Sequence, residues 1–220
     1  MNRPLLTTLC AAALALAVTA AFAAPAAAKS PAAKSPTKSV RSANGTISKL
    51  LRAKVEAGSA AEAKRASQVT TSLRDFLDVD ELGKLALVDH WKGLTETQQK
   101  DYLELLRALI EANYIKGLRA NLDYKVKYVS EEVRDDTTVV ATEINTKRKG
   151  RPIVIAIDYV LRKDGSNWRA IDVVTDGVGL VENYRAQFNR IISKESFDGL
   201  LDRMRQKLKR LKEPDGETSG

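Results

Sequence analysis

The sequence predicts an α+β domain in which helices pack on one face of a twisted, antiparallel, four-stranded sheet. Apolar residues recur with the 3.6-residue period of a helix from about residue 39 to 122. They then alternate with polar residues, as in half-buried strands, from 124 to 175, and the helical period returns from 179 to 212. Because helices and strands are segregated along the chain and the strands have short joints, we expect an antiparallel meander with N- and C-terminal helices.

The first 28 residues have the features of a secretory signal peptide. Arg3 gives the start a positive charge, residues 5–23 are apolar or small, and residues 21–23 and 26–28 both fit a small-x-small cleavage site. The one cysteine, Cys10, lies inside this leader. Cleavage after residue 28 would leave no thiol, which excludes disulfides, thiolate metal sites and cysteine nucleophiles from the mature protein.

Three further segments follow the leader. Residues 29–38 are interpreted as a solvated linker, because Lys, Ser, Pro and Ala without large apolar side chains cannot build a core. We expect residues 39–212 to form the folded domain and residues 213–220 to be a disordered tail. The formal net charge is +8. In an exported protein this surplus favours anionic lipid headgroups or an acidic docking surface over nucleic acid.

Four helices are expected before the strands. The first follows an apolar stripe over residues 40–55, is interrupted at Asn44-Gly45 and ends at Gly58-Ser59, after which a second helix begins. Asp78 is placed to cap a short third helix, and Thr95–Gln98 forms a capping box for a long fourth helix.

The strands and the closing helices follow in order. Strands are expected at about 124–128, 137–145, 153–161 and 168–175. Two helices close the domain, near 179–194 and 197–212. The last helix has an apolar stripe and many basic residues elsewhere, so it could lie on an anionic membrane. We favour the simpler interpretation that it docks against the domain with its charges in water.

Few residues point to catalysis or to metal binding. His90 is the only histidine, so it cannot form a metal cluster, and we expect it to be packed and hydrogen-bonded at a helix end. No glycine-rich phosphate loop, G-x-S-x-G or H-E-x-x-H motif occurs. Asp158 and Asp172 lie within expected strands, where an inward carboxylate could act as a general base if burial raised its pKa. We therefore keep an enzyme with such a base as a less favoured alternative.

One long segment carries a more specific signal. Residues 167–188, NWRAIDVVTDGVGLVENYRAQF, resemble the signature of the MlaC family, in which a strand with W-x-(x)-x-D-V leads through a short turn into N-Y-R-x-Q-F. Residues 85–98 and 197–201 resemble the family's L-G-x-x-W…T-x-x-Q junction and its F-x-x-L-[IL] closing helix. The resemblance covers about residues 40–212. Gly179 and Asp176 depart from it, because the family usually has Ser and commonly Glu there.

The resemblance implies a periplasmic phospholipid carrier without catalytic activity. Such a carrier exchanges lipid with an inner-membrane ABC transporter complex, through its MCE-type subunit, and with an outer-membrane lipoprotein–porin complex. No metal, nucleotide or other cofactor is implied, and no nucleic-acid partner. The expected sheet with its helical cover also resembles an NTF2-like fold. An exported binding protein for another apolar ligand, such as a hopanoid or an aromatic solvent, is the main alternative.

A carrier needs an apolar cavity between one sheet face and the inward stripes of the helices. The expected lining residues are Leu106, Ile110, Tyr114, Ile155, Ile157, Tyr159, Val173, Val178, Leu180, Tyr184 and Phe188. Arg185 is a candidate partner for the lipid headgroup, because its guanidinium group suits a phosphate.

Overall fold

The computed structural model describes residues 35–56, 58–120, 124–148 and 150–213, without the side chains of residues 114–120 and 148. The predicted signal peptide, most of the predicted linker and the tail from residue 214 lie outside these ranges. The helices are α1 (Pro36–Arg52), α2 (Ala60–Phe76), α3 (Val79–Ala86), the 3₁₀ helix η1 (Trp91–Gly93), α4 (Glu96–Ala120) and α5 (Leu180–Lys212). The strands are β1 (Tyr124–Arg134), β2 (Thr137–Arg148), β3 (Arg151–Asp164), β4 (Asn167–Thr175) and β5 (Val178–Gly179).

Helix α1 begins three residues before the expected start of the domain. The Ser35 side chain accepts a hydrogen bond from the Lys38 amide at 3.2 Å, and Pro36 occupies the first turn, where its missing N–H costs nothing. The helix runs through Asn44-Gly45 without the expected interruption. The reason is that the Asn44 side chain bonds tyrosines of the sheet, so its polar group does not compete with the helix backbone.

The sheet is an antiparallel meander in the order β1-β2-β3-β4-β5, with all of its neighbours consecutive along the chain. The α+β class is confirmed, but the expectation of four strands is wrong. After β4, Asp176 and Gly177 both adopt positive φ, 48° and 83°, and this tight turn folds Val178–Gly179 back as a fifth strand. Two residues are too few to show an alternating pattern, so periodicity could not predict this strand.

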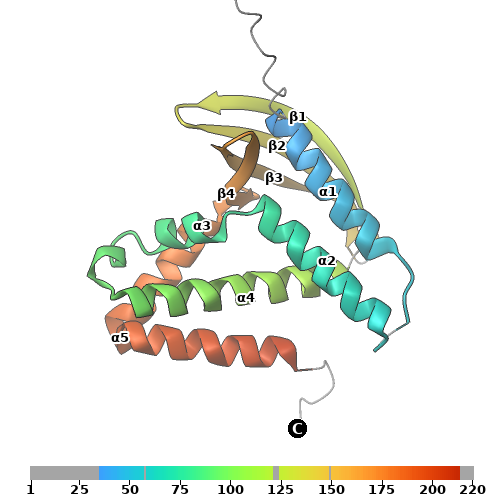
Figure 1. Ribbon diagram of the computed structural model, residues 1–220. Coiled ribbons are helices and arrows are strands. Elements are labelled where there is room, and N and C mark those ends of the chain that lie inside the picture. Colours follow the sequence, from blue (N-terminus) through green and yellow to red (C-terminus); the bar gives the residue numbers. More distant parts are fainter. Residues whose placement is uncertain (1–34, 57, 121–123, 149, 214–220) are drawn as a thin grey trace, which may run out of the picture. The chain divides into compact units, whose positions relative to one another are not determined.

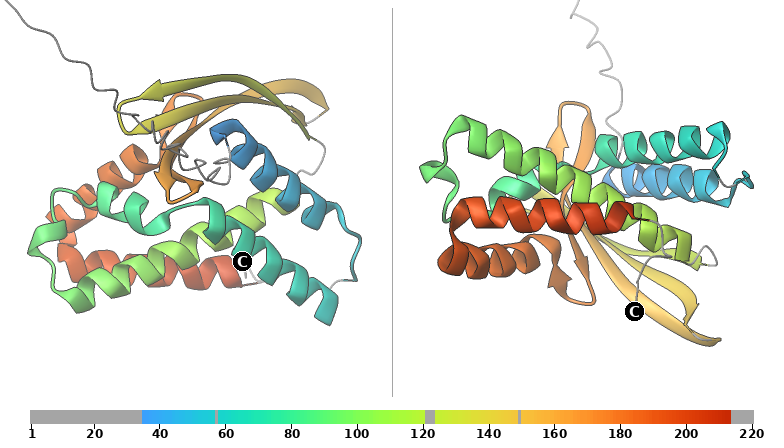
Figure 2. Two further views of the ribbon diagram at one scale, coloured as in Figure 1. Left: turned by 45° about the horizontal axis from the view of Figure 1, so that its top comes forward. Right: turned by 90° about the horizontal axis from the view of Figure 1, so that it is seen from below.

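The helices gather on one face of the curved sheet (Figures 1 and 2). Alternation along β3 shows which face this is. Tyr159 and Leu161 are 8% and 0% exposed and belong to the main core, whereas Val154 points the other way and is 59% exposed. The expectation that helices pack on only one face of the sheet is therefore confirmed, because the opposite face carries none of these helices.

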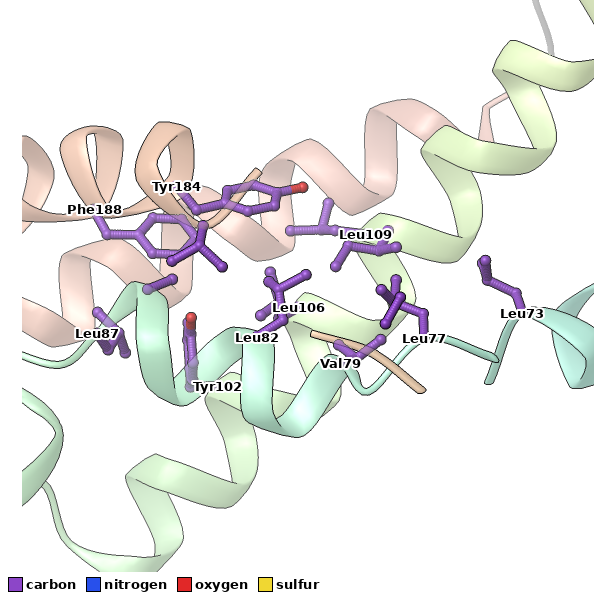
Figure 3. Close-up of a cluster of buried hydrophobic side chains, with 14 of the residues drawn as sticks. Leu73, Leu77, Val79, Leu82, Leu87, Tyr102, Leu106, Leu109, Tyr184 and Phe188 are labelled. Atoms are coloured by element: carbon purple, nitrogen blue, oxygen red, sulfur yellow. The ribbon is translucent and has the colours of Figure 1, made fainter. Parts of the chain in front are cut away.

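The centre of the helical layer lies between α3, α4 and the first half of α5 (Figure 3). Tyr102 is fully buried, and its hydroxyl donates to the Gly83 carbonyl at 3.1 Å. A β-carbon at Gly83 would lie 2.8 Å from Leu103 and 2.9 Å from Leu106, so this glycine permits the close approach of α3 and α4. The rings of Tyr184 and Phe188 stack with their centroids 5.2 Å apart.

Helix α5 consists of two helical segments that meet at Ser196, as the sequence predicted. Ser196 has φ 73° and ψ 175°, a backbone conformation that breaks the helix. In the second segment Leu200, Leu201 and Met204 are buried in the main core. The favoured interpretation of this amphipathic helix, docking against the domain, is confirmed.

Candidate functional site

A cavity of about 400 Å³ lies between the inner face of the sheet and four helices. Its lining comprises Asn44 and Ile47 of α1; Leu73 and Phe76 of α2, with Leu77 just after this helix; Ile110 and Asn113 of α4; Ile157 and Tyr159 of β3; Val173 and Thr175 of β4; and Leu180 and Tyr184 of α5. None of these side chains is acidic or basic. The cavity is thus an uncharged and mainly apolar space at the small end of ligand pockets.

Six of the eleven expected lining residues do line this cavity. They come from α4, from neighbouring strands and from the start of α5: Ile110, Ile157, Tyr159, Val173, Leu180 and Tyr184. The two strands meet in register, with Ile157 opposite Thr175 and Tyr159 opposite Val173, so their inward side chains form one continuous wall.

Of the other five expected residues, four do not line the cavity and one cannot be placed. Leu106 and Phe188 are 0% and 4% exposed and fill the core between the helices. Ile155 is half-buried on β3 but does not reach the cavity. Val178 is 57% exposed, because in the short β5 its neighbour Gly179 is buried and successive residues face opposite ways. Tyr114 belongs to α4, but its side chain lies outside the described part of the chain.

The first two helices contribute lining residues that the sequence did not predict. The lining also includes Ile47, Leu73, Phe76 and Leu77. A signal was present, because Ile47 lies on the apolar stripe of the first expected helix, and such a stripe must face something apolar. Asn44, which was interpreted as a helix breaker, instead lines the cavity.

Two tyrosines contribute hydroxyl groups to the wall, beside Asn44, Asn113 and Thr175. The Tyr159 hydroxyl donates to Asn44 Oδ1 at 3.3 Å, and desolvation by burial raises the pKa of Tyr159 to about 12. Burial also raises the pKa of Tyr184. Both phenols therefore stay uncharged at neutral pH, so they can donate hydrogen bonds without adding a charge to the lining.

Arg185 lies outside the lining. Its Nη2 donates to the Leu85 carbonyl at 2.7 Å, which ties α5 to the end of α3. Its Nε is buried and, within the described residues, has no hydrogen-bond partner. A role for Arg185 at a lipid headgroup stays a prediction that this geometry does not favour.

The two candidate general bases are placed away from the cavity. Asp172 Oδ1 accepts from the backbone amides of Val173 at 2.8 Å and Val181 at 3.0 Å. It thereby caps the N-terminus of α5, where Gly179 has no side chain to do so. Asp158 follows Ile157 on β3 and so points to the opposite face of the sheet.

The remaining polar candidate is structural. His90 Nε2 lies 3.0 Å from Asn189 Oδ1, and Asn189 in turn donates to Asp89 at 3.0 Å. The prediction of a packed, hydrogen-bonded histidine is confirmed. Among the described residues no group of three or more His, Cys, Asp or Glu side chains could hold a metal ion. In the same ranges, no helix combines the length and apolar character that crossing a bilayer requires.

Comparison with known proteins gives a consistent result. The sequence matches the MlaC protein family over residues 41–206. It is 22% identical over 140 residues to the intermembrane phospholipid transport system binding protein MlaC of Haemophilus influenzae. This alignment covers 63% of this chain and 65% of that protein. The chain therefore spans just under two thirds of the length of this relative.

A solved structure shares the fold. It is the phospholipid-binding protein of Ralstonia solanacearum in complex with a phospholipid, with a TM-score of 0.68 and 22% sequence identity. The alignment covers 80% of this chain and 97% of the other.

Proposed function

The chain belongs to the MlaC protein family, and from this premise we propose that it is a periplasmic carrier that moves phospholipid between membranes. The observation that carries the proposal is the uncharged cavity between the sheet and the helices. Its wall presents aliphatic and aromatic side chains from both layers of the fold, which is the environment that an acyl chain requires.

The size of the cavity fits an acyl chain. If a methylene group occupies about 30 Å³, close to the share of a water molecule, then 400 Å³ holds roughly a dozen of them. Burying each methylene contributes about 0.8 kcal/mol, so one chain gains on the order of 10 kcal/mol over exposure to water. The volume of the cavity thus matches about a dozen carbons of one acyl chain, and both chains of a phospholipid would exceed it.

The partners follow from the family. The Haemophilus relative is described as the binding protein of an intermembrane phospholipid transport system. We infer that this chain exchanges lipid with an inner-membrane MCE-type ABC transporter complex and with an outer-membrane lipoprotein–porin complex. The carrier itself does no chemistry in this scheme, since the cavity lining contains no ionisable carboxylate, histidine or lysine.

Native mass spectrometry of the protein purified without detergent tests this proposal. The expected result is an adduct with the mass of a phospholipid, which organic extraction releases and which liposomes restore. A protein that stays empty after incubation with phospholipid liposomes would refute the proposal. An adduct that proves to be a hopanoid or an aromatic compound would refute the phospholipid assignment and leave an exported binding protein for another apolar ligand.

A further inference from the structure

A second and more polar recess of about 630 Å³ lies between α1, the end of α2 and the β3–β4 turn. Phe76 lines both this recess and the apolar cavity, so one side chain forms a wall common to the two spaces. The Phe76 ring is held edge-on against Tyr159, with the centroids 5.6 Å apart. The two spaces therefore adjoin at Phe76, so a ligand that reaches past this ring would place one end in apolar and the other in polar surroundings.

The two cationic groups of the recess already have anionic partners. Arg74 makes two hydrogen bonds to Glu111, at 2.5 and 3.0 Å. Arg169 lies 3.4 Å from Asp78 and also donates to the carbonyls of Arg74 and Leu77, at 3.1 and 3.2 Å. The positive charge of each guanidinium group is therefore already balanced by a carboxylate, so neither offers an unpaired charge to a phosphate.

Ser72 and Asp164 of the recess also have partners, Gln68 and Arg169, but in the described part of the chain five further polar side chains do not. Within the described residues, the carboxylate of Asp75 has no hydrogen-bond or ion-pair partner. The same holds for the side chains of Asn167, Ser39, Ser42 and Thr46. The half-buried indole of Trp168 lies in the same wall. A free carboxylate with hydroxyl oxygens and an aromatic ring is a suitable environment for an ammonium group.

The electrostatic surroundings of the recess also favour a cation. Although the whole chain carries a formal net charge of +8, this recess offers a free carboxylate and no free cation. It also lies at the C-terminal end of α2, where the helix dipole favours positive charge.

We propose that the recess beside Phe76 binds the ammonium group of a zwitterionic phospholipid headgroup, of the ethanolamine type, while an acyl chain of the same lipid occupies the apolar cavity. This inference rests on the proposed lipid-carrier function and adds a headgroup preference to it. Asp75 supplies the counter-charge, and the hydroxyl groups of α1 accept the remaining ammonium hydrogens. Because Asp75 is exposed, the preference is modest, about fivefold over a headgroup without an ammonium group.

Tryptophan fluorescence can report on this recess directly. The chain has two tryptophans, and Trp91→Phe leaves Trp168 as the only one. In this background, lysophosphatidylethanolamine and lysophosphatidylglycerol with the same acyl chain are titrated below their critical micelle concentrations. We expect both to bind, the ethanolamine lipid about fivefold more tightly and with the larger change in Trp168 emission. Asp75→Asn should bring the two dissociation constants together, and Glu104→Gln, which removes an exposed carboxylate on α4, should leave the preference intact.

The outcomes separate this inference from the carrier function. Equal affinities in the parent protein, or a preference that Asp75→Asn does not change, would overturn the headgroup site and leave the carrier function standing. Phosphoethanolamine without a chain that binds as tightly as the lysolipid would also overturn it, because the ligand would then be a free headgroup compound. Failure of both lysolipids to bind would overturn the carrier function as well.

Discussion

Replacing Ile157 with glutamate places a carboxylate in the wall of the apolar cavity and should exclude lipid at neutral pH. Ile157 lies on the inner face of β3 and lines the cavity. Its carbonyl accepts a hydrogen bond from the Thr142 hydroxyl at 2.8 Å, and this backbone contact does not depend on the side chain at 157. We therefore expect Ile157→Glu to keep the sheet register and to fold.

The size of the effect follows from the cost of neutralising the new group. Water can solvate the carboxylate in the empty cavity, but an acyl chain removes that water, so the glutamate must first be protonated. With an ordinary pKa of about 4.3, protonation at pH 7 costs about 3.7 kcal/mol, which corresponds to a roughly 500-fold loss of lipid affinity. At pH 5 the cost falls to about 1 kcal/mol, or about fivefold. Binding should therefore weaken as the pH rises from 5 to 7.

Two control variants isolate this mechanism. Ile157→Gln has nearly the same shape but does not ionise, so its affinity should not depend on pH over this range. Val154→Glu adds the same charge on the exposed face of the same strand and should bind lipid as the parent does. Displacement of a fluorescent lipid measures the affinities, and circular dichroism checks the fold. If folded Ile157→Glu bound lipid at pH 7 as tightly as Val154→Glu, the assignment of this wall to the acyl chain would be wrong.

Three further predictions concern stability, each measured by denaturant unfolding. Tyr102→Phe should lower the free energy of unfolding by only about 0.5–1 kcal/mol, because the Gly83 carbonyl still accepts a hydrogen bond from the Leu87 amide. A loss above about 3 kcal/mol would contradict this prediction. Ser196→Gly should stabilise the protein by about 1 kcal/mol and raise Tm by about 3 °C. The reason is that glycine adopts φ 73° without strain and is an acceptable N-cap for the second helical segment. A lower Tm would show that the backbone of Ser196 is not strained. Burial raises the pKa of Tyr159 to about 12, so the folded state holds this proton where the unfolded state, with a pKa of about 10, loses it. Stability should fall between pH 10 and 12, and Tyr159→Phe should make that fall shallower; equal slopes would show that Tyr159 does not contribute.

Periodicity predicted the parts of the site that lie on long, regular elements. Alternation along β3 identified Ile157 and Tyr159, and the helical stripe of α4 identified Ile110. Periodicity gives the face of an element but not how far along that face a cavity extends. For this reason Leu106, one helical turn before Ile110, was expected in the cavity and is instead packed in the core.

Other features depend on contacts between distant parts of the chain. Asn44 was interpreted as a helix breaker because asparagine is a poor helix former, yet its bond to Tyr159, 115 residues away, gives it a place within α1. Asp172 was weighed as a base because strand carboxylates can be buried. Its capping bond to Val181 exists only because β5 brings the start of α5 back beside β4. Such pairings are set by the tertiary fold and have no signature in the local sequence.

Photo-crosslinking with a phospholipid that carries a diazirine in the middle of one acyl chain tests the central claim most directly. Peptide mapping of the crosslinked protein locates the chain without any assumption about affinity. We predict crosslinks to residues of the cavity wall on α4, β3 and the start of α5, such as Ile110, Ile157 and Leu180. Crosslinks confined to the outer face of the sheet around Val154, or to the last turns of α5, would show that the chain lies on the surface and would contradict the account.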